Sequence, residues 1–188
     1  MNEELPTLID EARAIADDAQ KTFGHLSAEQ LNWRPNADEW SVAQCFDHLI
    51  VINADYFPVI RNIARGEYKA SLKERLPLLP RLFGSMILKA VQPEAQRKLK
   101  ADPRFRPSSS TIDTDIIAKF DAHQREVIEH MKMTEHVNLR TVIITSPVAS
   151  FATYSLLDAY KILVTHERRH MTQARRVMGT EGFPTREP

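Results

Sequence analysis

The sequence predicts an all-α protein, a four-helix bundle with a long insertion between its second and third helices. Four segments repeat apolar residues at spacings of three and four, the period of a helix that packs on one face. One connection between them is long and rich in proline. The single β-branched run, Thr141–Thr145, has no evident partner strand, so we interpret it as an extended connection. Long amphipathic helices without alternating strands are typical of bundles.

The first two helices have recognisable ends. We expect the first helix over about Glu3–Phe23, because Gly24 is a stop signal. Ser41 is a good N-cap for the second helix, which we expect over about Val42–Arg65. Pro58 falls inside this second pattern and is expected to kink or shorten the helix.

The segment that follows, residues 67–110, has a different composition. It contains five prolines and only one short helical pattern, near Arg81–Val91. A long insertion in a compact domain is often a lid or a binding loop. Its apolar part, Leu76–Val91, is therefore a candidate lid or dimer surface, and a homodimer is a candidate assembly.

Helical periodicity resumes after the insertion. Ser110 or Thr111 is expected to cap the third helix, which runs to about Thr134. The fourth helix, about Ser155–Met178, has the strongest pattern, and Gly179 supplies its stop signal.

Length, charge and cysteine content narrow the class of protein. A chain of 188 residues fits one domain, here residues 1–180, followed by a C-terminal tail at 181–188. Lys and Arg total 25, as do Asp and Glu, so we expect no nucleic-acid partner. The apolar stretch Leu76–Pro93 is interrupted by prolines and charges, which argues against a membrane span. Because the N-terminus has no signal-peptide pattern and Cys45 is the only cysteine, we expect a cytoplasmic protein.

The segment "HERRH" in the fourth helix matches the H-E-x-x-H pattern of zinc proteases. Those enzymes need a third ligand further along the chain. One arrangement places a histidine six residues after His170, where this chain has Arg176. Another takes a glutamate from a later helix, which the nine residues after Gly179 cannot build. We therefore set the protease interpretation aside, and we expect Glu167, about 100° around the helix from His166, to face solvent.

The two histidines of this helix remain candidate metal ligands. His166 and His170 share its apolar face with Gln173, and two imidazoles four residues apart can chelate one ion. The alternatives are core histidines satisfied by other hydrogen bonds, or a partly exposed pair on a charged helix. His48 in the second helix is also expected to face the core, and three histidines from two facing helices would leave coordination positions open. For His123, near the inner face of the third helix, we expect a core histidine with satisfied hydrogen bonds.

Three segments together resemble the DinB-like, YfiT-like metal-binding four-helix bundles. They are "LSAEQLNWRPNADEWSVAQCFDHLI", "RFRPSSS" and "SPVASFATYSLLDAYKILVTHERRHMTQARRV". In the first segment, the family's Leu, Trp-x-Pro, Trp-Ser and His-Leu match Leu31, Trp33, Pro35, Trp40, Ser41, His48 and Leu49. The third segment carries a His-x-x-x-His followed three residues later by Gln. The likeness covers about residues 1–180.

The resemblance implies a divalent metal ion held by His48, His166 and His170. Zn²⁺ suits three imidazoles, with Ni²⁺, Fe²⁺ and Mn²⁺ as alternatives. The family is similar in fold to the bacillithiol- and mycothiol-dependent transferases, so we expect an S-transferase that uses a low-molecular-weight thiol and a small-molecule substrate. A metal-dependent hydrolase, and a non-catalytic bundle with a structural or vestigial metal site, are the alternatives. The insertion at 67–110 departs from the most compact members of the family.

Further residues are candidates for supporting such a site. Three polar side chains could orient a ligand or a bound water: Gln173, Asp55 and Asp47. Four basic residues could meet the carboxylates of a small thiol, although a solvated face is the simpler interpretation: Arg97, Lys98, Arg104 and Arg106. Trp33 and Trp40 are expected to pack the connection before the second helix against the bundle.

Overall fold

The computed structural model describes residues 3–75, 79–93, 103–107 and 111–185, and it confirms a mostly helical protein. The α-helices are α1 (Glu4–Phe23), α2 (Ala28–Asn32), α3 (Val42–Ala54), α4 (Phe57–Ala64), α5 (Leu79–Ala90), α6 (Ile116–Lys132) and α7 (Leu156–Met178). The other elements are two short 3-10 helices, η1 (Lys73–Arg75) and η2 (Pro103–Phe105), and two strands, β1 (Ile143–Thr145) and β2 (Thr153–Ser155).

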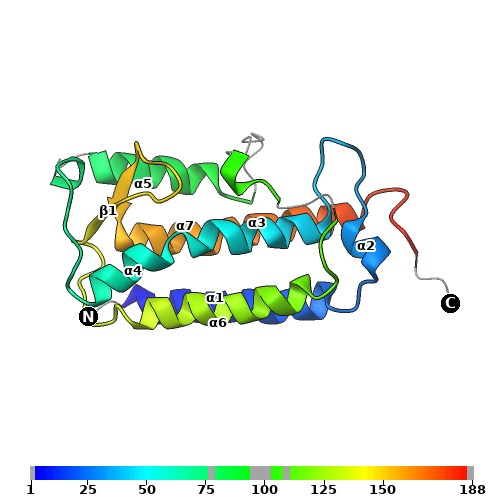
Figure 1. The fold of residues 1–188 in the computed structure, drawn as a ribbon, viewed down its shortest axis with the longest axis horizontal. Helices are drawn as coiled ribbons and strands as arrows, with labels where there is room; N and C mark the ends of the chain where they lie inside the picture. Colours follow the sequence, from blue (N-terminus) through cyan, green and yellow to red (C-terminus); the bar gives the residue numbers. More distant parts are fainter. Residues whose placement is uncertain (1–2, 76–78, 94–102, 108–110, 186–188) are drawn as a thin grey trace.

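The four longest helices lie side by side (Figure 1). α1 packs against α6 and α7, and α3 packs against the same two helices, so the four enclose a common core. In that core the ring of Phe46 meets Phe23 and Phe120 edge to face, with centroid separations of 5.2 and 4.9 Å. Burying one such side chain contributes about 1.5–3 kcal/mol, so this aromatic cluster helps to stabilise the core that the four helices share.

The second predicted helix is divided in two. α3 ends at Ala54, and α4 starts at Phe57 with Pro58 in its first turn. Proline is well tolerated there, because the first turn of a helix has no internal partner for its N–H groups. The predicted effect of Pro58 is therefore confirmed as a break between two helices. The Ser41 cap is also confirmed, since its hydroxyl accepts from the backbone N–H of Gln44.

The third helix begins later than the sequence predicts. α6 starts at Ile116, so the predicted Thr111 cap is wrong, and Ser110 lies outside the described residues. The side chain of Asn32 explains the difference, because its amide donates to the carbonyl of Ile112 and its oxygen accepts from the N–H of Ile112. This reciprocal pair holds the backbone at Ile112 outside the helix while the Ile112 side chain is buried.

The extended run before α7 has a partner strand, which the sequence did not reveal. β1 pairs antiparallel with β2, and Ile144 lies opposite Tyr154. β2 has three residues and leads directly into α7, with Ser155 both pairing with Ile143 and capping the helix. A strand of this length is too short to show period-two alternation, so it merges with the helical pattern that follows.

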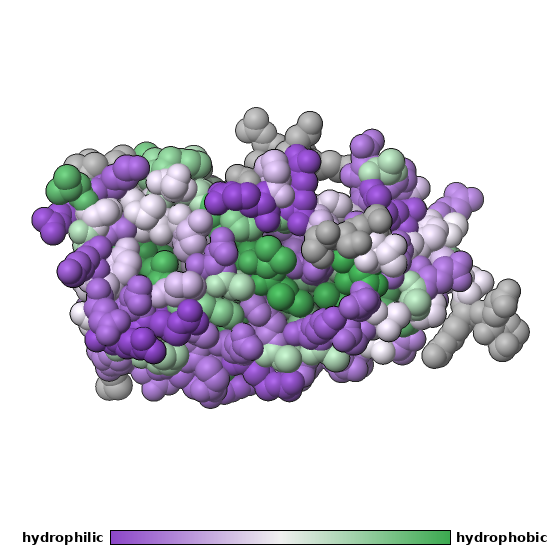
Figure 2. Space-filling view, in the orientation of Figure 1, coloured by the Kyte–Doolittle hydropathy of each residue, from purple (hydrophilic) through white to green (hydrophobic). Residues whose placement is uncertain are grey.

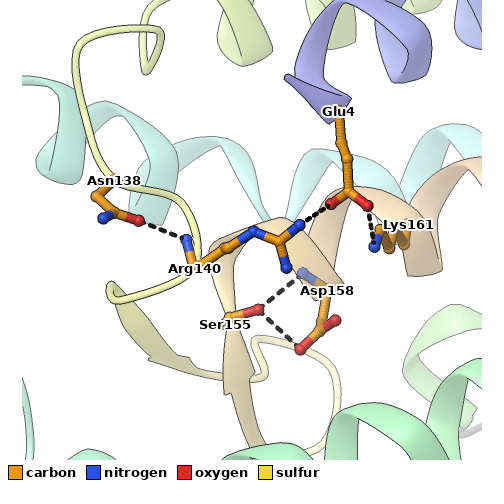
Figure 3. Close-up of polar contacts among 6 residues, drawn as sticks. All are labelled: Glu4, Asn138, Arg140, Ser155, Asp158 and Lys161. Carbon is orange, nitrogen blue, oxygen red and sulfur yellow. Dashed lines mark hydrogen bonds and ion pairs between the residues drawn. The ribbon is translucent and has the colours of Figure 1, made fainter. Parts of the chain in front are cut away.

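One end of the bundle is fastened by polar contacts (Figure 3). Glu4 of α1 accepts from Arg140 and from Lys161 of α7, each at 3.0 Å. Ser155 caps α7 by accepting from the N–H of Asp158 and donating to its carboxylate. The ion pairs are partly exposed, so each contributes only about 0–1 kcal/mol.

Near the opposite terminus, the C-terminal tail folds back on the segment around α2. The Nε2 of Gln30 donates to the carbonyl of Pro184 at 2.9 Å. The rings of Trp33 and Phe183 meet edge to face, with centroids 5.6 Å apart. Trp33 therefore packs against the chain's last described turn, and the part of the tail up to residue 185 is ordered against α2.

α5 lies along α7 and β2, and the contact is close at Gly84. A Cβ atom at Gly84 would lie 3.0 Å from the Oδ2 of Asp158 and 3.2 Å from the Cβ of Tyr154, which leaves no room for a side chain. The opposite side of α5 is exposed, with Leu82 at 65% and Met86 at 49% of their full accessible surface. The helix predicted near Arg81–Val91 is thus present and has an outward apolar face.

A second apolar surface runs along α3. Figure 2 shows hydrophobic residues gathered through the middle of one face of the molecule. In α3, Ile50, Val51 and Ile52 are partly exposed. In the described part of the chain, no helix combines the length and apolar character that crossing a membrane requires.

The connection between α4 and α5 is anchored by one carboxylate, that of Glu74. It accepts four hydrogen bonds of 2.7 Å, from the Tyr68 hydroxyl, the Ser71 N–H, and the N–H and hydroxyl of Thr145 in β1. Burial by itself raises the pKa of Glu74, but the bonds from Thr145, Tyr68 and Ser71 outweigh it and lower the pKa. The ionised form is therefore the one that the fold stabilises.

We expect Glu74→Ala to lower the free energy of unfolding by about 3 kcal/mol at pH 7, because it removes four hydrogen bonds that a buried carboxylate accepts. Urea unfolding of this variant measures the loss, and Glu67→Ala, which changes an exposed carboxylate nearby, is the control. Because the folded pKa of Glu74 is depressed, its contribution is present at neutral pH and is lost as the pH falls through that pKa. Equal midpoints for both variants at pH 7 would contradict the anchoring role.

Candidate metal centre

α3 and α7 bring three histidines together. His48 comes from α3, His166 and His170 come from α7, and their candidate ligand atoms all lie within 4.8 Å of one another. The ring of His170 is central, with centroids 4.8 Å from His48 and 4.6 Å from His166. His48 and His170 are buried, and His166 is partly exposed. The structure therefore places the three predicted residues in one cluster, and His166 is its most exposed member.

A backbone carbonyl of η2 fixes the orientation of His48. The Nδ1 of His48 is hydrogen bonded to the carbonyl oxygen of Phe105 in η2. A carbonyl can only accept, so Nδ1 carries the proton and Nε2 keeps its lone pair for a ligand. A metal-binding histidine commonly has this kind of partner on its other nitrogen. Phe105 lies 57 residues away in the sequence, and no local pattern indicates the contact.

The surroundings keep all three imidazoles neutral at pH 7. Burial, helped by the charges of His48 and Arg169, lowers the pKa of His166 to about 3. Burial also lowers the pKa of His170, and the neighbouring His166, His48 and Arg169 act in the same direction. For His48, burial again dominates and lowers the pKa, although the Phe105 carbonyl and Asp47 oppose it. Neutral imidazole is the form that binds metal, so no proton has to be removed first at this pH.

The indole of Trp40 covers one side of the cluster. Its ring stacks on His170 with an interplanar angle of 15° and a centroid separation of 5.6 Å. It also contacts His48 in a tilted arrangement, with centroids 4.9 Å apart. The sequence predicts that Trp40 packs against the helices. In the structure it packs directly against two of the candidate ligands, His48 and His170.

Arg169 links the cluster to the end of α5. Its guanidinium donates to the carbonyls of Ala90 and Gln92, at 3.2 and 2.8 Å. The same cation is near enough to His166 and His170 to lower the pKa of both. Arg169 thus ties the end of α5 to α7, as Phe105 ties η2 to α3.

Of the three residues predicted to support the site, Gln173 and Asp47 interact with its histidines, whereas in the described structure no interaction with them is seen for Asp55. Gln173 is partly exposed. Its side-chain amide lies beside the His170 ring, where a hydrogen bond from it acts to raise the pKa of that histidine. Asp47 is partly exposed and its charge acts on His48. Asp55 lies just past the end of α3 with its side chain exposed, and its role at the site stays a prediction.

The predicted basic residues fall into two groups. Arg104 and Arg106 flank the buried Phe105 in the chain and are exposed, and the Arg104 guanidinium lies 5.0 Å from the centroid of the Phe105 ring. Arg97 and Lys98 lie outside the described residues.

The expectation that Glu167 faces solvent is wrong. Its side chain is fully buried, and its two oxygens accept from the Nδ2 of Asn53 and the Nε2 of Gln124. Burial raises its pKa to about 7, although the bonds from Gln124 and Asn53 and the charge of Arg168 oppose the rise.

The cause of this error is the width of the buried face of α7, which packs against both α1 and α3. A face 100° away from His166 therefore still points into the protein. The sequence contained a signal for this, because Leu163 and Met171 stand four residues on either side of Glu167 and both are buried. The two oxygens of the Glu167 carboxylate accept hydrogen bonds from Asn53 and Gln124. In a zinc protease this glutamate would act as the general base at the metal, so its position here agrees with setting that interpretation aside.

The remaining histidines do not join the cluster. His123 of α6 is buried as predicted, but its Nε2 has no hydrogen-bond partner in the described structure, so the expectation of a satisfied histidine is wrong. His130 is partly exposed and stacks on Phe57 at 4.1 Å between centroids. His25 and His136 are exposed.

The ring nitrogens of the cluster fit a bound cation. The Nε2 atoms of His166 and His170 face one another at 3.0 Å. Each of these nitrogens can offer a lone pair to an ion when its ring carries the proton on Nδ1. The buried Nδ1 of His170 has no hydrogen-bond partner among the described residues. Three neutral nitrogen donors, with no charged group among them, are the ligand set that borderline divalent ions such as Zn²⁺ prefer.

The chain is thus a mostly helical protein in which three buried or half-buried histidines, from two facing helices, form a candidate metal centre. Comparison with protein-family models matches residues 11–174 to the DinB superfamily, and the chain belongs to this family. Neither the curated proteins nor the solved structures compared with the chain gave a match. The resemblance in the sequence is therefore confirmed at the level of the family.

Proposed function

We propose that the chain is a divalent-metal-dependent enzyme, a four-helix bundle with an insertion at 67–110, that transfers a low-molecular-weight thiol to an electrophilic small molecule. The observation that carries this proposal is the meeting of three neutral imidazoles, from His48, His166 and His170, with no carboxylate among them. Three protein ligands leave coordination positions open, as catalytic sites require, whereas structural zinc sites are closed by four. Membership of the DinB superfamily, which is typically metal-binding, supports the same proposal.

Zn²⁺ is the ion that we propose, with Ni²⁺, Fe²⁺ and Mn²⁺ as alternatives that also accept imidazole. When bound, such an ion supplies positive charge that favours the deprotonated form of a thiol or of water. The chain's own residues would orient and shield the site. The Phe105 carbonyl fixes the tautomer of His48, and Trp40 keeps water from one face of His170.

The class of thiol is proposed from charge. Arg169 stands beside the imidazoles, and Arg104 and Arg106 are exposed on either side of Phe105. These cations would attract a small thiol that carries carboxylates. In the transfer, the thiolate sulfur attacks an electrophilic carbon and forms a carbon–sulfur bond. The bond from that carbon to its leaving group breaks, the group departs with the electron pair, and the thiol proton passes to solvent.

Metal content and thiol-dependent turnover test the proposal together. Elemental analysis should find about one divalent ion per wild-type chain and far less in His166→Ala. Protein loaded with Zn²⁺ is then incubated with cysteine and an activated aryl chloride, and the loss of the chloride is compared with that in His48→Ala. Equal rates would reject the transferase, and hydrolysis without added thiol would favour a hydrolase. Low metal content that the substitution leaves unchanged would reject the metal site.

A further inference from the structure

The buried carboxylate of Glu167 connects α7 directly to α3 and α6, and through Gln124 to α1. Its Oε1 accepts from the Nδ2 of Asn53 in α3 at 2.8 Å, and its Oε2 accepts from the Nε2 of Gln124 in α6 at 2.9 Å. The same Gln124 nitrogen also lies 3.3 Å from the carbonyl of Ala12 in α1. One side chain of α7 is therefore bonded directly to two neighbouring helices and indirectly to the third.

The bond to α3 joins the same two helices as the histidine cluster. Asn53 follows His48 by five residues on α3, and Glu167 follows His166 directly on α7. We propose that Glu167 is a positioning residue that sets the rotation of α7, so that His166 and His170 meet His48. This inference deepens the proposed metal function, since the geometry it controls is that of the candidate ligands.

Small rotations matter at a metal centre. An imidazole nitrogen lies about 6 Å from its helix axis, so turning α7 by about 20° moves that nitrogen by about 2 Å. Metal–ligand distances must hold within about 0.2 Å. The rotation of α7 must therefore be fixed much more tightly than contact between apolar surfaces requires.

Apolar packing specifies that rotation weakly. α7 is apolar on several sides near the cluster, with Leu163, Val164, Met171 and Ala174 all buried. A helix with such a broad apolar surface can turn while its apolar contacts are partly kept. A carboxylate held by two directional bonds at fixed positions on α3 and α6 removes this freedom, as buried polar groups do in some other bundles.

The two amides that hold Glu167 allow a sharp choice of variants. The Oδ1 of Asn53 and the Oε1 of Gln124 have no hydrogen-bond partner among the described residues. In Glu167→Gln, one of these amides can flip and accept from the new NH₂ group, so both links are kept. Glu167→Leu fills the space and removes both links, and Asn53→Leu removes only the link to α3.

Affinity for Zn²⁺, measured by isothermal titration calorimetry, is the first readout. We expect Glu167→Leu to bind about 10- to 100-fold more weakly than wild type, the usual effect of losing a residue that orients metal ligands. Glu167→Gln should stay within about threefold of wild type, and Asn53→Leu should fall between the two. The matched control is Tyr160→Phe, which lies seven residues earlier on α7 and loses its 2.8 Å bond to Thr134. It should lower thermal stability without changing the affinity.

Fluorescence of the metal-free protein gives a second readout that does not need the proposed function. In a Trp33→Phe background, Trp40 is the only tryptophan and reports on the stacking with His170 and His48. We expect Glu167→Leu and Asn53→Leu to shift its emission to longer wavelength, while Glu167→Gln and Tyr160→Phe leave it unchanged.

The outcomes separate the two proposals. A wild type that binds no Zn²⁺, together with the expected fluorescence shifts, would reject the metal site and keep the positioning role. Unchanged emission in a folded Glu167→Leu protein, or an affinity loss no larger than that of Tyr160→Phe, would overturn the positioning role. If Glu167→Leu does not fold, Asn53→Leu decides by the same two measurements.

Discussion

Replacing His170 by alanine is expected to lower the affinity for Zn²⁺ by more than about a hundredfold. His170 is the central member of the cluster, since its ring centroid lies 4.8 and 4.6 Å from those of His48 and His166, which are 5.2 Å from each other. Without it, two imidazoles on different helices remain, and the indole loses the ring on which it stacks. The loss should exceed that of any residue that only orients a ligand, because a direct bond to the ion is removed.

Thermal unfolding with added Zn²⁺ measures this effect without any assay of activity. At a free concentration of about 100 times Kd, an ion that binds only the folded state stabilises it by about 2.7 kcal/mol. For a domain of this size that raises Tm by about 5–10 °C. At the same concentration His170→Ala should gain about 1 °C or less, since the ion is then near or below its Kd.

His25→Ala is the matched control, because His25 is exposed and lies outside the cluster. It should keep the full rise in Tm. A rise of the same size in His170→Ala would show that Zn²⁺ stabilises the protein somewhere else, and the proposed centre would have to be abandoned.

The helices were predictable because each shows its signal locally. α1 was found within one residue at its start, since eight apolar residues at helical spacing are all buried. The break before α4 followed from the chemistry of Pro58 alone. β2 and the late start of α6 were missed for different reasons. β2 is too short to show a period, and the backbone at Ile112 is held by Asn32, which lies 80 residues earlier in the sequence.

The candidate site was predictable only in part, and the division has a physical basis. His166 and His170 share a face of one helix, so spacing was enough to pair them. His48 needed two further facts, that α3 packs on α7 and that both turn these faces to one another. The Phe105 carbonyl and the bonds of Glu167 depend on contacts between distant segments, and no periodicity records those. Sequence patterns thus identified the candidate ligands, while the groups that orient them could be found only in the fold.

The second large effect that we expect is a loss of stability in acid caused by His123. Its side chain is buried in α6 beside Phe57, and its Nε2 has no hydrogen-bond partner in the described structure. Burial and, to a smaller extent, the charge of the nearby His130 together lower its pKa to about 4. The unfolded chain, in which the pKa is near its ordinary value of 6.5, therefore binds a proton that the folded protein resists.

The sign and size follow from this difference in proton binding. The contribution of His123 to stability is fully present above pH 6.5, falls as the pH is lowered, and levels off near pH 4. Over that range it amounts to about 3 kcal/mol. The buried Glu167 acts in the opposite direction, because its pKa is raised and its contribution to stability falls as the pH rises towards about 7.

Comparing wild type with His123→Leu separates the effect of His123 on the pH dependence of stability from the effects of such opposing groups. Urea unfolding between pH 4.5 and 6.5 should show a steeper rise of stability with pH in wild type than in His123→Leu, which has no group to protonate at that position. His136→Gln removes an exposed histidine and should keep the wild-type slope. Parallel slopes in wild type and His123→Leu would mean that the proton reaches His123 in the folded protein without penalty. The unpartnered imidazole beside Phe57 would then have to be solvated rather than buried.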